Sequence, residues 1–314
     1  MIVNKVHNID FLDNDLPDKC AKLIIADPPY YKVKGAFDFI WKTFDDYLAD
    51  VEKWAIECKR ILADNGTLLW YGDDKNIAYA QIIFDKYFNL ENNLIWYKYN
   101  LRGGMFGSTG GDNVMCFPIC TERILMYSNG DDYHDNVRLS IKSVQYYLNT
   151  ITTRDELAEL LFKNGNCKNI ASAKQNANNI LTQKSAKPQL ISKHQYNLIP
   201  YENKKEYEDL RKEYEDLRRP FNNKFNLNEV LQYNTNTNNE YDHDTVKPET
   251  LTRALILTCS RKDDLVVVPF AGSGTECAMS AKEKRPFIGY EITEKHAKMS
   301  QERADKILKE PTLF

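Results

Sequence analysis

The sequence lacks several features that would place it in other protein classes. No apolar run approaches the length that crosses a membrane, and the opening residues do not form a secretory signal. The seven cysteines include no Cys-x-x-Cys pair and no second Cys or His pair at zinc spacing. We therefore expect no membrane partner, no bound metal, and reduced cysteines in a cytoplasmic protein.

A Gly-x-Gly-x-x-Gly run is also absent, which argues against a dinucleotide cofactor. The net charge of -3 is small and neither supports nor excludes a nucleic-acid partner, because the distribution of charge matters more than its sum. The length of 314 residues exceeds what one hydrophobic core usually serves. A large domain with a smaller inserted domain is therefore expected.

Both ends of the sequence alternate strand-like and helix-like segments. This alternation favours an α/β fold with a mixed, mostly parallel sheet and helices on both faces. We expect the sheet domain to comprise residues 1–128 and 243–314. Strands are expected over 23–26, 67–71, 93–98, 264–269 and 286–290, and helices over 44–62, 76–87, 251–260, 272–283 and 294–308.

The middle of the chain, residues 129–242, has a different composition. It is rich in Asn and Lys, lacks strong strand runs, and carries six lysines and no acid between Leu160 and Pro200. Helices are expected over 153–162 and 169–181, in the manner of a helix-turn-helix. A heptad written twice over 207–220 predicts a packing helix that closes this insertion. A solvated helical insertion without DNA contacts is the alternative.

Residues 99–116 form a third kind of segment, with five glycines in eighteen positions. The segment is either a flexible surface loop or a mobile lid over a substrate. Lys98 just before it and Arg102 within it are candidate contacts to DNA phosphates, with simple solvation as the alternative.

Asp27-Pro28-Pro29-Tyr30 follows the first predicted buried strand. An exocyclic amine of a base is a poor nucleophile because its lone pair is delocalised into the ring. A site that methylates this amine therefore has to accept hydrogen bonds from the NH2 group. A carboxylate at a strand end can accept one, and a carbonyl oxygen next to the prolines can accept the other. The aromatic ring that follows can stack on an extruded base.

A Phe-Ala-Gly-Ser-Gly-Thr run at residues 270–275 lies between a predicted strand and a predicted helix. Small residues let a ligand approach the backbone, and a helix N-terminus favours a carboxylate. Glu291 ends the next strand, where an acid can bind ribose hydroxyl groups. A lone Gly-x-Gly is weak evidence, but this combination indicates a ligand that contains ribose.

Together the two motifs resemble those of the DNA amino-methyltransferases. In that family an Asp/Asn/Ser-Pro-Pro-aromatic motif is catalytic and a Phe-x-Gly-x-Gly motif binds S-adenosylmethionine. The order here, with the catalytic motif first, the insertion next and the cofactor motif last, resembles the β group of the family. A third match, at residues 243–248, is similar to a His-x-Thr-x-Lys-Pro segment that contacts the methionine end of the cofactor. The resemblance covers roughly residues 6–128 and 243–300.

The resemblance implies a set of site residues. Asp10 falls where many members have Gly-Asp, and Thr121-Glu122-Arg123 falls where members often have His-Glu. The catalytic residues would be Asp27, Pro28, Pro29 and Tyr30. The residues expected to bind S-adenosylmethionine are Asp10, Asp27, His243, Thr245, Lys247, Phe270, Gly272, Ser273, Gly274, Thr275 and Glu291.

The insertion would then be the target-recognition domain. Lys168 and Lys174 would contact phosphates of double-stranded DNA, which contribute affinity without sequence information. Gln175 and Asn179 would read base edges from the helix over 169–181, because an amide side chain can bind adenine with two hydrogen bonds.

The resemblance thus implies a Rossmann-like methyltransferase that flips an adenine out of DNA and methylates its N6 atom. Asp at the first motif position favours adenine, and N4 of cytosine is the nearest alternative. A catalytically silent DNA-binding subunit of the same fold is the alternative from another class, although the intact Asp27, Gly272 and Gly274 argue against it. A cognate restriction endonuclease and a second copy of the chain stay open as partners.

Overall fold

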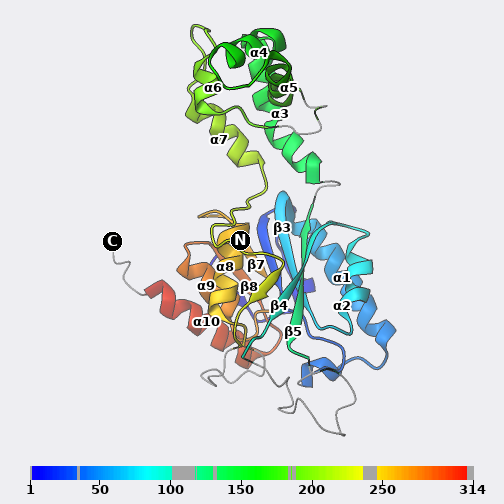
Figure 1. The fold of residues 1–314 in the computed structure, drawn as a ribbon. Helices are drawn as coiled ribbons and strands as arrows, with labels where there is room; N and C mark the ends of the chain where they lie inside the picture. Colours follow the sequence, from blue (N-terminus) through cyan, green and yellow to red (C-terminus); the bar gives the residue numbers. More distant parts are fainter. Residues whose placement is uncertain are drawn as a thin grey trace. The chain divides into compact units, whose positions relative to one another are not determined.

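A computed structural model describes residues 2–33, 36–100, 117, 119–129, 133–182, 185, 189–235 and 246–309 (Figure 1). The chain divides into two compact units. We call residues 1–129 with 220–314 the sheet unit, and residues 130–219 the helical unit. Among the described residues, no helix combines the length and the apolar character needed to cross a membrane.

The described part of the sheet unit contains one sheet of eight strands, in the order β1-β8-β7-β2-β3-β5-β4-β6. Only β5 runs antiparallel to its neighbours, β3 and β4, so the predicted mixed, mostly parallel sheet is confirmed. The strands are β1 (Lys5–His7), β2 (Ala21–Ala26), β3 (Leu62–Gly72), β4 (Asn89–Tyr97), β5 (Thr121–Ser128), β6 (Val230–Gln232), β7 (Val266–Val268) and β8 (Phe287–Tyr290).

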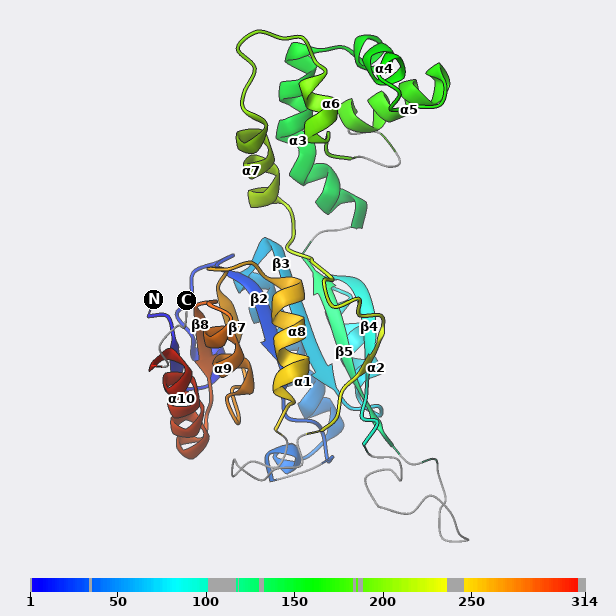
Figure 2. The same ribbon diagram turned by 60° about the vertical axis from the view of Figure 1, so that its left-hand side comes forward.

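Helices cover both faces of this sheet (Figure 2). Along β2, Leu23 and Ile25 pack into the core shared with α8, α9 and α10, whereas Ile24 and Ala26 pack into the core shared with α1 and α2. A strand buried on both faces forms a continuous apolar run, which is why this one can be predicted from sequence. The helices are α1 (Phe44–Ile61), α2 (Ile77–Phe84), α8 (Glu249–Cys259), α9 (Thr275–Lys282) and α10 (Glu294–Lys309), with 3-10 turns η1 (Phe11–Asp13) and η2 (Ala36–Phe39).

The helical unit has a hydrophobic core of its own. Thr153 and Asn169 cap α4 and α5 with reciprocal hydrogen bonds to the third residue of each helix, so the two helices begin where the sequence predicts. The repeated heptad forms α7, which packs on α3 and contributes Leu210 to the core. The helices are α3 (Tyr133–Ile151), α4 (Arg154–Lys163), α5 (Ile170–Leu181), α6 (Lys193–Asn197) and α7 (Tyr207–Leu217).

The helical unit ends earlier than the insertion predicted to run to residue 242, because the chain returns to the sheet unit at Pro220. There β6 pairs with β4, and the indole of Trp96 donates a hydrogen bond to the carbonyl of Tyr233 at 2.8 Å. A strand of three residues among polar neighbours gives no periodicity to detect. The same reason applies to β1, while α3 was missed because it is rich in residues with weak helix propensity.

Candidate active site

The cavity that gathers the predicted motifs lies at one edge of the sheet. Asp27 follows β2, Pro269 follows β7 and Glu291 follows β8, so parallel strands deliver them to the same edge. Glu122 joins them as the second residue of β5. This strand runs antiparallel to β3, so it begins at the edge of the sheet where β3 ends. The cavity has a volume of about 220 Å³ and is lined within the sheet unit.

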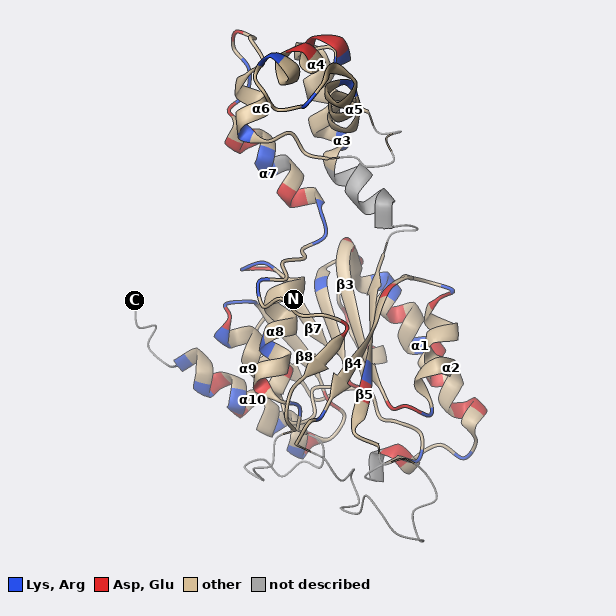
Figure 3. Ribbon diagram, in the orientation of Figure 1, with Lys and Arg blue, Asp and Glu red and all other residues tan. Residues whose placement is uncertain are grey.

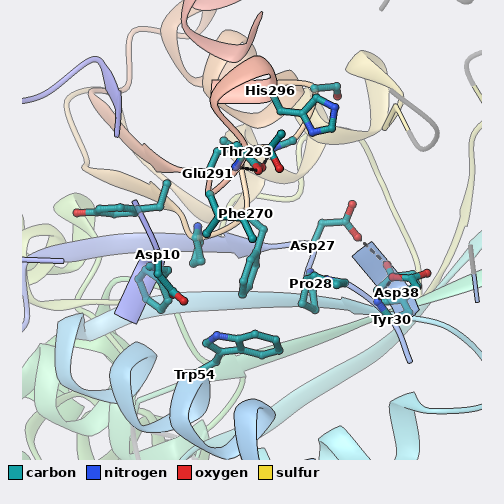
Figure 4. Close-up of a pocket in the computed structure, with 18 of the residues that line it drawn as sticks. Asp10, Asp27, Pro28, Tyr30, Asp38, Trp54, Phe270, Glu291, Thr293 and His296 are labelled. Atoms are coloured by element: carbon teal, nitrogen blue, oxygen red, sulfur yellow. Dashed lines mark hydrogen bonds between the residues drawn. The ribbon is translucent and has the colours of Figure 1, made fainter. Parts of the chain in front are cut away.

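One wall of the cavity is aromatic (Figure 4). The ring of Phe270 meets Trp54 edge-on at 5.0 Å between centroids and Phe11 at 6.3 Å. Trp41 extends this wall and contacts Trp54 at 6.2 Å. An apolar wall of fixed rings suits a flat heteroaromatic ligand.

Glu291 presents a fixed carboxylate to the cavity. One oxygen accepts the backbone N–H of Gly272 at 3.0 Å, and the other accepts the backbone N–H of Thr293 at 2.9 Å. Gly272 reaches this position with a φ of 47°, in the left-handed region that favours glycine. Each carboxylate oxygen can accept a further hydrogen bond, so Glu291 keeps capacity for hydroxyl groups of a ligand.

Asp10 also lines the cavity, and in the view of Figure 4 Phe270 is drawn between Asp10 and Asp27. The Asp10 carboxylate accepts the backbone N–H of Leu12 at 2.9 Å and so caps η1. The cap holds this side chain at the rim while leaving it exposed. The aromatic wall thus has one acid near each end of it.

Gly274 and Thr275 belong to the same motif but are not among the residues that line the cavity. Gly274 has a φ of 78°, and a Cβ atom there would lie 2.6 Å from the Cα atom of Ser300 in α10. The Thr275 hydroxyl accepts a hydrogen bond from Arg303 at 2.8 Å. Both contacts are with residues of α10. Gly274 and Thr275 therefore support the site through the packing of α9 on α10.

Asp27 is held by hydrogen bonds to both carboxylate oxygens. The Tyr30 hydroxyl donates to Oδ1 at 2.6 Å, and the Lys247 ammonium contacts Oδ2 at 2.8 Å. The Tyr30 backbone N–H donates to Asp38 at 2.5 Å, which fixes the turn after the two prolines. Burial raises the pKa of Tyr30 well above its usual value, and the charge of Asp27 adds to the shift.

Lys247 connects Asp27 to a second buried ion pair. Its ammonium lies 3.2 Å from Glu122, whose other oxygen pairs with Lys98. The Lys247 side chain is only 5% exposed. Burial alone would raise the pKa of Glu122, but the ammonium groups of Lys247 and Lys98 hold it below its usual value. Burial lowers the pKa of Lys247, and the two carboxylates more than reverse that effect.

Lys98 was predicted to contact phosphate, and the structure places its ammonium elsewhere. The side chain is 10% exposed, paired with Glu122 and stacked over the ring of Trp96 at 4.7 Å. A buried ammonium that already has a carboxylate partner is not presented to a DNA backbone. We therefore correct this assignment: Lys98 belongs to the ion network beneath Asp27.

Glu276 is a further acid on the cavity wall that the sequence interpretation missed. Its side chain lies in the first turn of α9 and is buried. Burial and the charge of Asp27 raise the pKa of Glu276 to about 7, against the opposing effects of Lys247 and Arg303. An acid two residues after Gly274 and directly before Cys277-Ala278-Met279 is the sequence signal that could have found it.

Glu122 was also missed, although the triplet that contains it was noticed. Its pairing with Lys98 and Lys247 joins residues far apart in the chain, so no local pattern reveals it. Three predicted residues, Arg102, His243 and Thr245, lie outside the described residues, as does most of the segment 99–116.

The predicted DNA contacts of the insertion lie in the helical unit. Lys168, Lys174 and Gln175 are exposed, and Lys174 lies 4.0 Å from Asp155. The Asn179 side-chain oxygen is engaged inside the unit, since it accepts hydrogen bonds from Gln175 at 3.0 Å and Ser185 at 2.6 Å. Lysines 168 and 174 are thus available to a ligand, while the Asn179 carbonyl would first have to exchange partners.

Comparison with known proteins gives a consistent picture. A family model for N6/N4 enzymes, described as DNA methylase, matches residues 21–302. The DNA adenine methyltransferase YhdJ of Escherichia coli is 25% identical over 92% of this chain and 78% of that protein. The type II methyltransferase M.HinfI of Haemophilus influenzae is 23% identical over 94% of this chain, which spans 66% of that protein.

Solved structures share the fold. The Thermus thermophilus protein TTHA0409, in complex with S-adenosyl-L-methionine, superposes with a TM-score of 0.53 at 16% identity, over 97% of this chain and 94% of that one. The PvuII DNA methyltransferase, described as cytosine-N4-specific, has a TM-score of 0.53 at 13% identity, over 96% and 90% of the two chains. At sequence identities this low, the structural similarity supports only the assignment of the Rossmann-like fold.

Proposed function

Since the chain belongs to the family of N6/N4 DNA methylases, we propose that it transfers a methyl group from S-adenosylmethionine to N6 of adenine in double-stranded DNA. One observation carries the proposal. The hydrogen-bond acceptors of Asp27-Pro28-Pro29-Tyr30 line the same cavity as the aromatic wall and the fixed carboxylate of Glu291. The cavity thus combines a possible binding site for an amine, at Asp27, with a possible binding site for a nucleoside, between the aromatic wall and Glu291.

The residues of the cavity fit S-adenosylmethionine, which would supply a methyl group on a positively charged sulfur. Phe270 and Trp54 offer an apolar face for its adenine. Glu291 keeps acceptor capacity for the ribose hydroxyls, and Asp10 lies at the other end of the aromatic wall from Asp27. Gly272 and Ser273 also line the cavity, and residues this small leave room for a ligand close to the backbone.

The target amine would be held by Asp27 and by the Pro28 carbonyl. Asp27 can accept from the amine while Lys247 stays bound, because a carboxylate offers about four acceptor sites. We assign Lys247 a positioning role, since its pairs with Asp27 and Glu122 fix the carboxylate for the amine. Tyr30 would release Asp27 and stack on the flipped base.

Adenine is favoured over cytosine by Asp at the first position of the motif, and a relative that covers most of this chain is named as an adenine methyltransferase. N4 of cytosine is the second candidate, because a solved neighbour is named as specific for it. A silent subunit is disfavoured, since the acceptor Asp27 is intact and is held in place by Lys247 and Tyr30.

We also propose that the helical unit recognises the DNA sequence, with Lys168 and Lys174 on phosphates and Gln175 on a base edge. A cognate restriction endonuclease is a further proposal, which rests on a relative's name as a type II methyltransferase; a homodimer is also left as a proposal. The cytoplasm is the proposed location, because the reaction needs DNA together with the cofactor.

The decisive experiment expresses the protein in a methylation-deficient host and maps modified bases by single-molecule sequencing. N6-methyladenine at one recurring sequence is the expected result. N4-methylcytosine would replace the proposed base with the second candidate. Unmodified DNA, together with no transfer of labelled methyl groups in vitro, would favour the silent subunit.

A further inference from the structure

Glu276 is a buried acid, and one of its two carboxyl oxygens has no hydrogen-bond partner among the described residues. Its side chain is 4% exposed and lines the cavity from the first turn of α9. The Oε1 atom is buried and takes part in no hydrogen bond with any part of the chain that the structure describes. A buried carboxyl group without a partner is costly, so a ligand that supplies one would bind strongly.

The cations near Glu276 are engaged elsewhere. Lys247 contacts Asp27 and Glu122, and Arg303 donates to the Ser273 carbonyl at 3.1 Å and to Glu249 at 2.7 Å. The titratable groups whose charges act on Glu276 come from four elements or loops around it and from its own helix: Asp27 after β2, Tyr71 in β3, Lys247 before α8, Arg303 in α10 and Cys277 in α9.

The charges of the ion network around Asp27 balance without Glu276. Two carboxylates, Asp27 and Glu122, face two ammonium groups, Lys98 and Lys247. Ionised Glu276 adds one negative charge that the network does not compensate. Burial and the neighbouring Asp27 accordingly raise the pKa of Glu276 to about 7, so the chain by itself holds this group partly protonated at neutral pH.

S-adenosylmethionine carries one net positive charge, on sulfur, because the charges of its amino-acid end cancel. We propose that Glu276 is the counter-charge of this sulfonium, and that it releases its proton to solvent when the cofactor binds. The inference rests on the proposed function, which supplies the ligand. It places Glu276 beside the sulfur because the methyl carbon must lie near the amine held by Asp27, and Asp27 is the charge that acts most strongly on Glu276.

The same group would respond to the reaction. In the transfer the sulfur–methyl bond breaks, the nitrogen–methyl bond forms, the sulfur becomes neutral, and the methylated amine loses one proton. Glu276 then faces no cation and takes up a proton from solvent. Its carboxylate therefore favours the charged cofactor over S-adenosylhomocysteine, which carries no sulfonium and has no net charge.

The test is calorimetry of both ligands in buffers that differ in ionisation enthalpy. For the wild type we expect release of about half a proton on binding S-adenosylmethionine at pH 7, little release at pH 8.5, and little with S-adenosylhomocysteine. For Glu276→Gln we expect about tenfold weaker binding of S-adenosylmethionine, a change under about threefold for S-adenosylhomocysteine, and no linked proton. Glu283→Gln, at the far end of the same helix, is the matched control and should resemble the wild type.

The outcomes separate this inference from the function on which it rests. If the wild type binds S-adenosylmethionine and Glu276→Gln binds it equally well, the function stands and the counter-charge is overturned. An equal loss for both ligands assigns Glu276 to the ammonium of the methionine part and also overturns it. A wild type that binds neither ligand overturns the proposed function itself. Should the variant fail to fold, equal proton release with both ligands in the wild type is the overturning result.

Discussion

The sheet unit and the helical unit place their charged side chains in different ways. In the sheet unit Asp27, Lys247, Glu122 and Lys98 form one ion network beside the cavity, and their side chains are at most 19% exposed. In the described part of the helical unit the buried polar residues are uncharged, namely Gln145, Thr152 and Ser185. There ion pairs such as Lys163 with Glu159 and Lys193 with Glu208 lie at the surface, and acidic and basic residues both occur on α4 and α7 (Figure 3).

Buried and exposed ion pairs have different effects on a protein. A buried pair such as Lys247 with Asp27 is screened little, so it fixes geometry and changes the acidity of its neighbours. A surface pair such as Lys163 with Glu159, 70% and 63% exposed, contributes about 0 to 1 kcal/mol and can be exchanged for a phosphate at small cost. We therefore expect changes in the sheet unit to alter chemistry or stability, and changes in the helical unit to alter DNA affinity and sequence preference.

The largest effect is expected at Asp27. Asp27→Ala should lower the methylation rate by about a thousandfold or more, because the target amine loses its charged acceptor. Binding of S-adenosylmethionine should stay within about tenfold of the wild type, since the role proposed for Asp27 is to hold the base. Methyl transfer and calorimetry measure the two quantities. Asp18→Ala, which removes an exposed carboxylate of the same unit, is the control, and near-normal turnover of Asp27→Ala would end the assignment.

Replacing one glycine in each unit by alanine tests the comparison between the sheet unit and the helical unit. Gly274 and Gly165 have similar φ angles, 78° and 71°, but only Gly274 is crowded by Ser300, while Gly165 in the helical unit has open space. Gly274→Ala should lower the free energy of unfolding by about 2 to 5 kcal/mol, from backbone strain plus overpacking. Gly165→Ala should cost only the strain, about 1 to 2 kcal/mol. Denaturant unfolding measures both, and equal costs would contradict the packing of α9 on α10.

The pH dependence of the free energy of unfolding reports the protonation state of Glu276. Its pKa rises from 4.5 to about 7 on folding, so its contribution is fully present below pH 4.5 and is lost as the pH rises to 7. Glu276→Gln has no such loss and should gain stability relative to the wild type across this window, by up to about 3 kcal/mol. Thermal unfolding without ligand, from pH 5 to 8, measures the difference. Parallel curves for the two proteins would show that Glu276 is charged at every pH in the window.

The smallest effects are expected on the helical unit. Lys168→Ala or Lys174→Ala should weaken binding to every DNA sequence and lower the salt slope by about 1 unit, with the methylated sequence unchanged. Gln175→Ala should instead relax the methylated sequence, at about 1 to 3 kcal/mol for one base pair. Binding titrations at several salt concentrations and methylation mapping separate the two. If all three variants match the wild type, α5 is not the reading helix.

The sequence predicted what local patterns can encode. The buried strand before Asp27 and the glycine turn before Thr275 are short continuous signals, and both occur where the patterns place them. The pairing of Lys98 with Glu122 cannot be found this way, because it depends on β4 and β5 running side by side in opposite directions. Gly274 shows the same limit. The motif predicted a contact with the cofactor, whereas in the structure Gly274 has a left-handed backbone conformation and packs closely against Ser300.

The helical unit interrupts the sheet unit at only two junctions, and each is tied down on the sheet side. The Asn129 side chain donates to the Leu62 carbonyl at 3.0 Å, and the Asn222 backbone N–H donates to the Thr258 carbonyl at 2.8 Å. Each described residue that lines the cavity lies outside the interrupting segment. If the helical unit reads the DNA sequence, as we propose, it is a replaceable module: a chimera joined at these two junctions is expected to methylate another target sequence, while each described residue that lines the cavity stays the same.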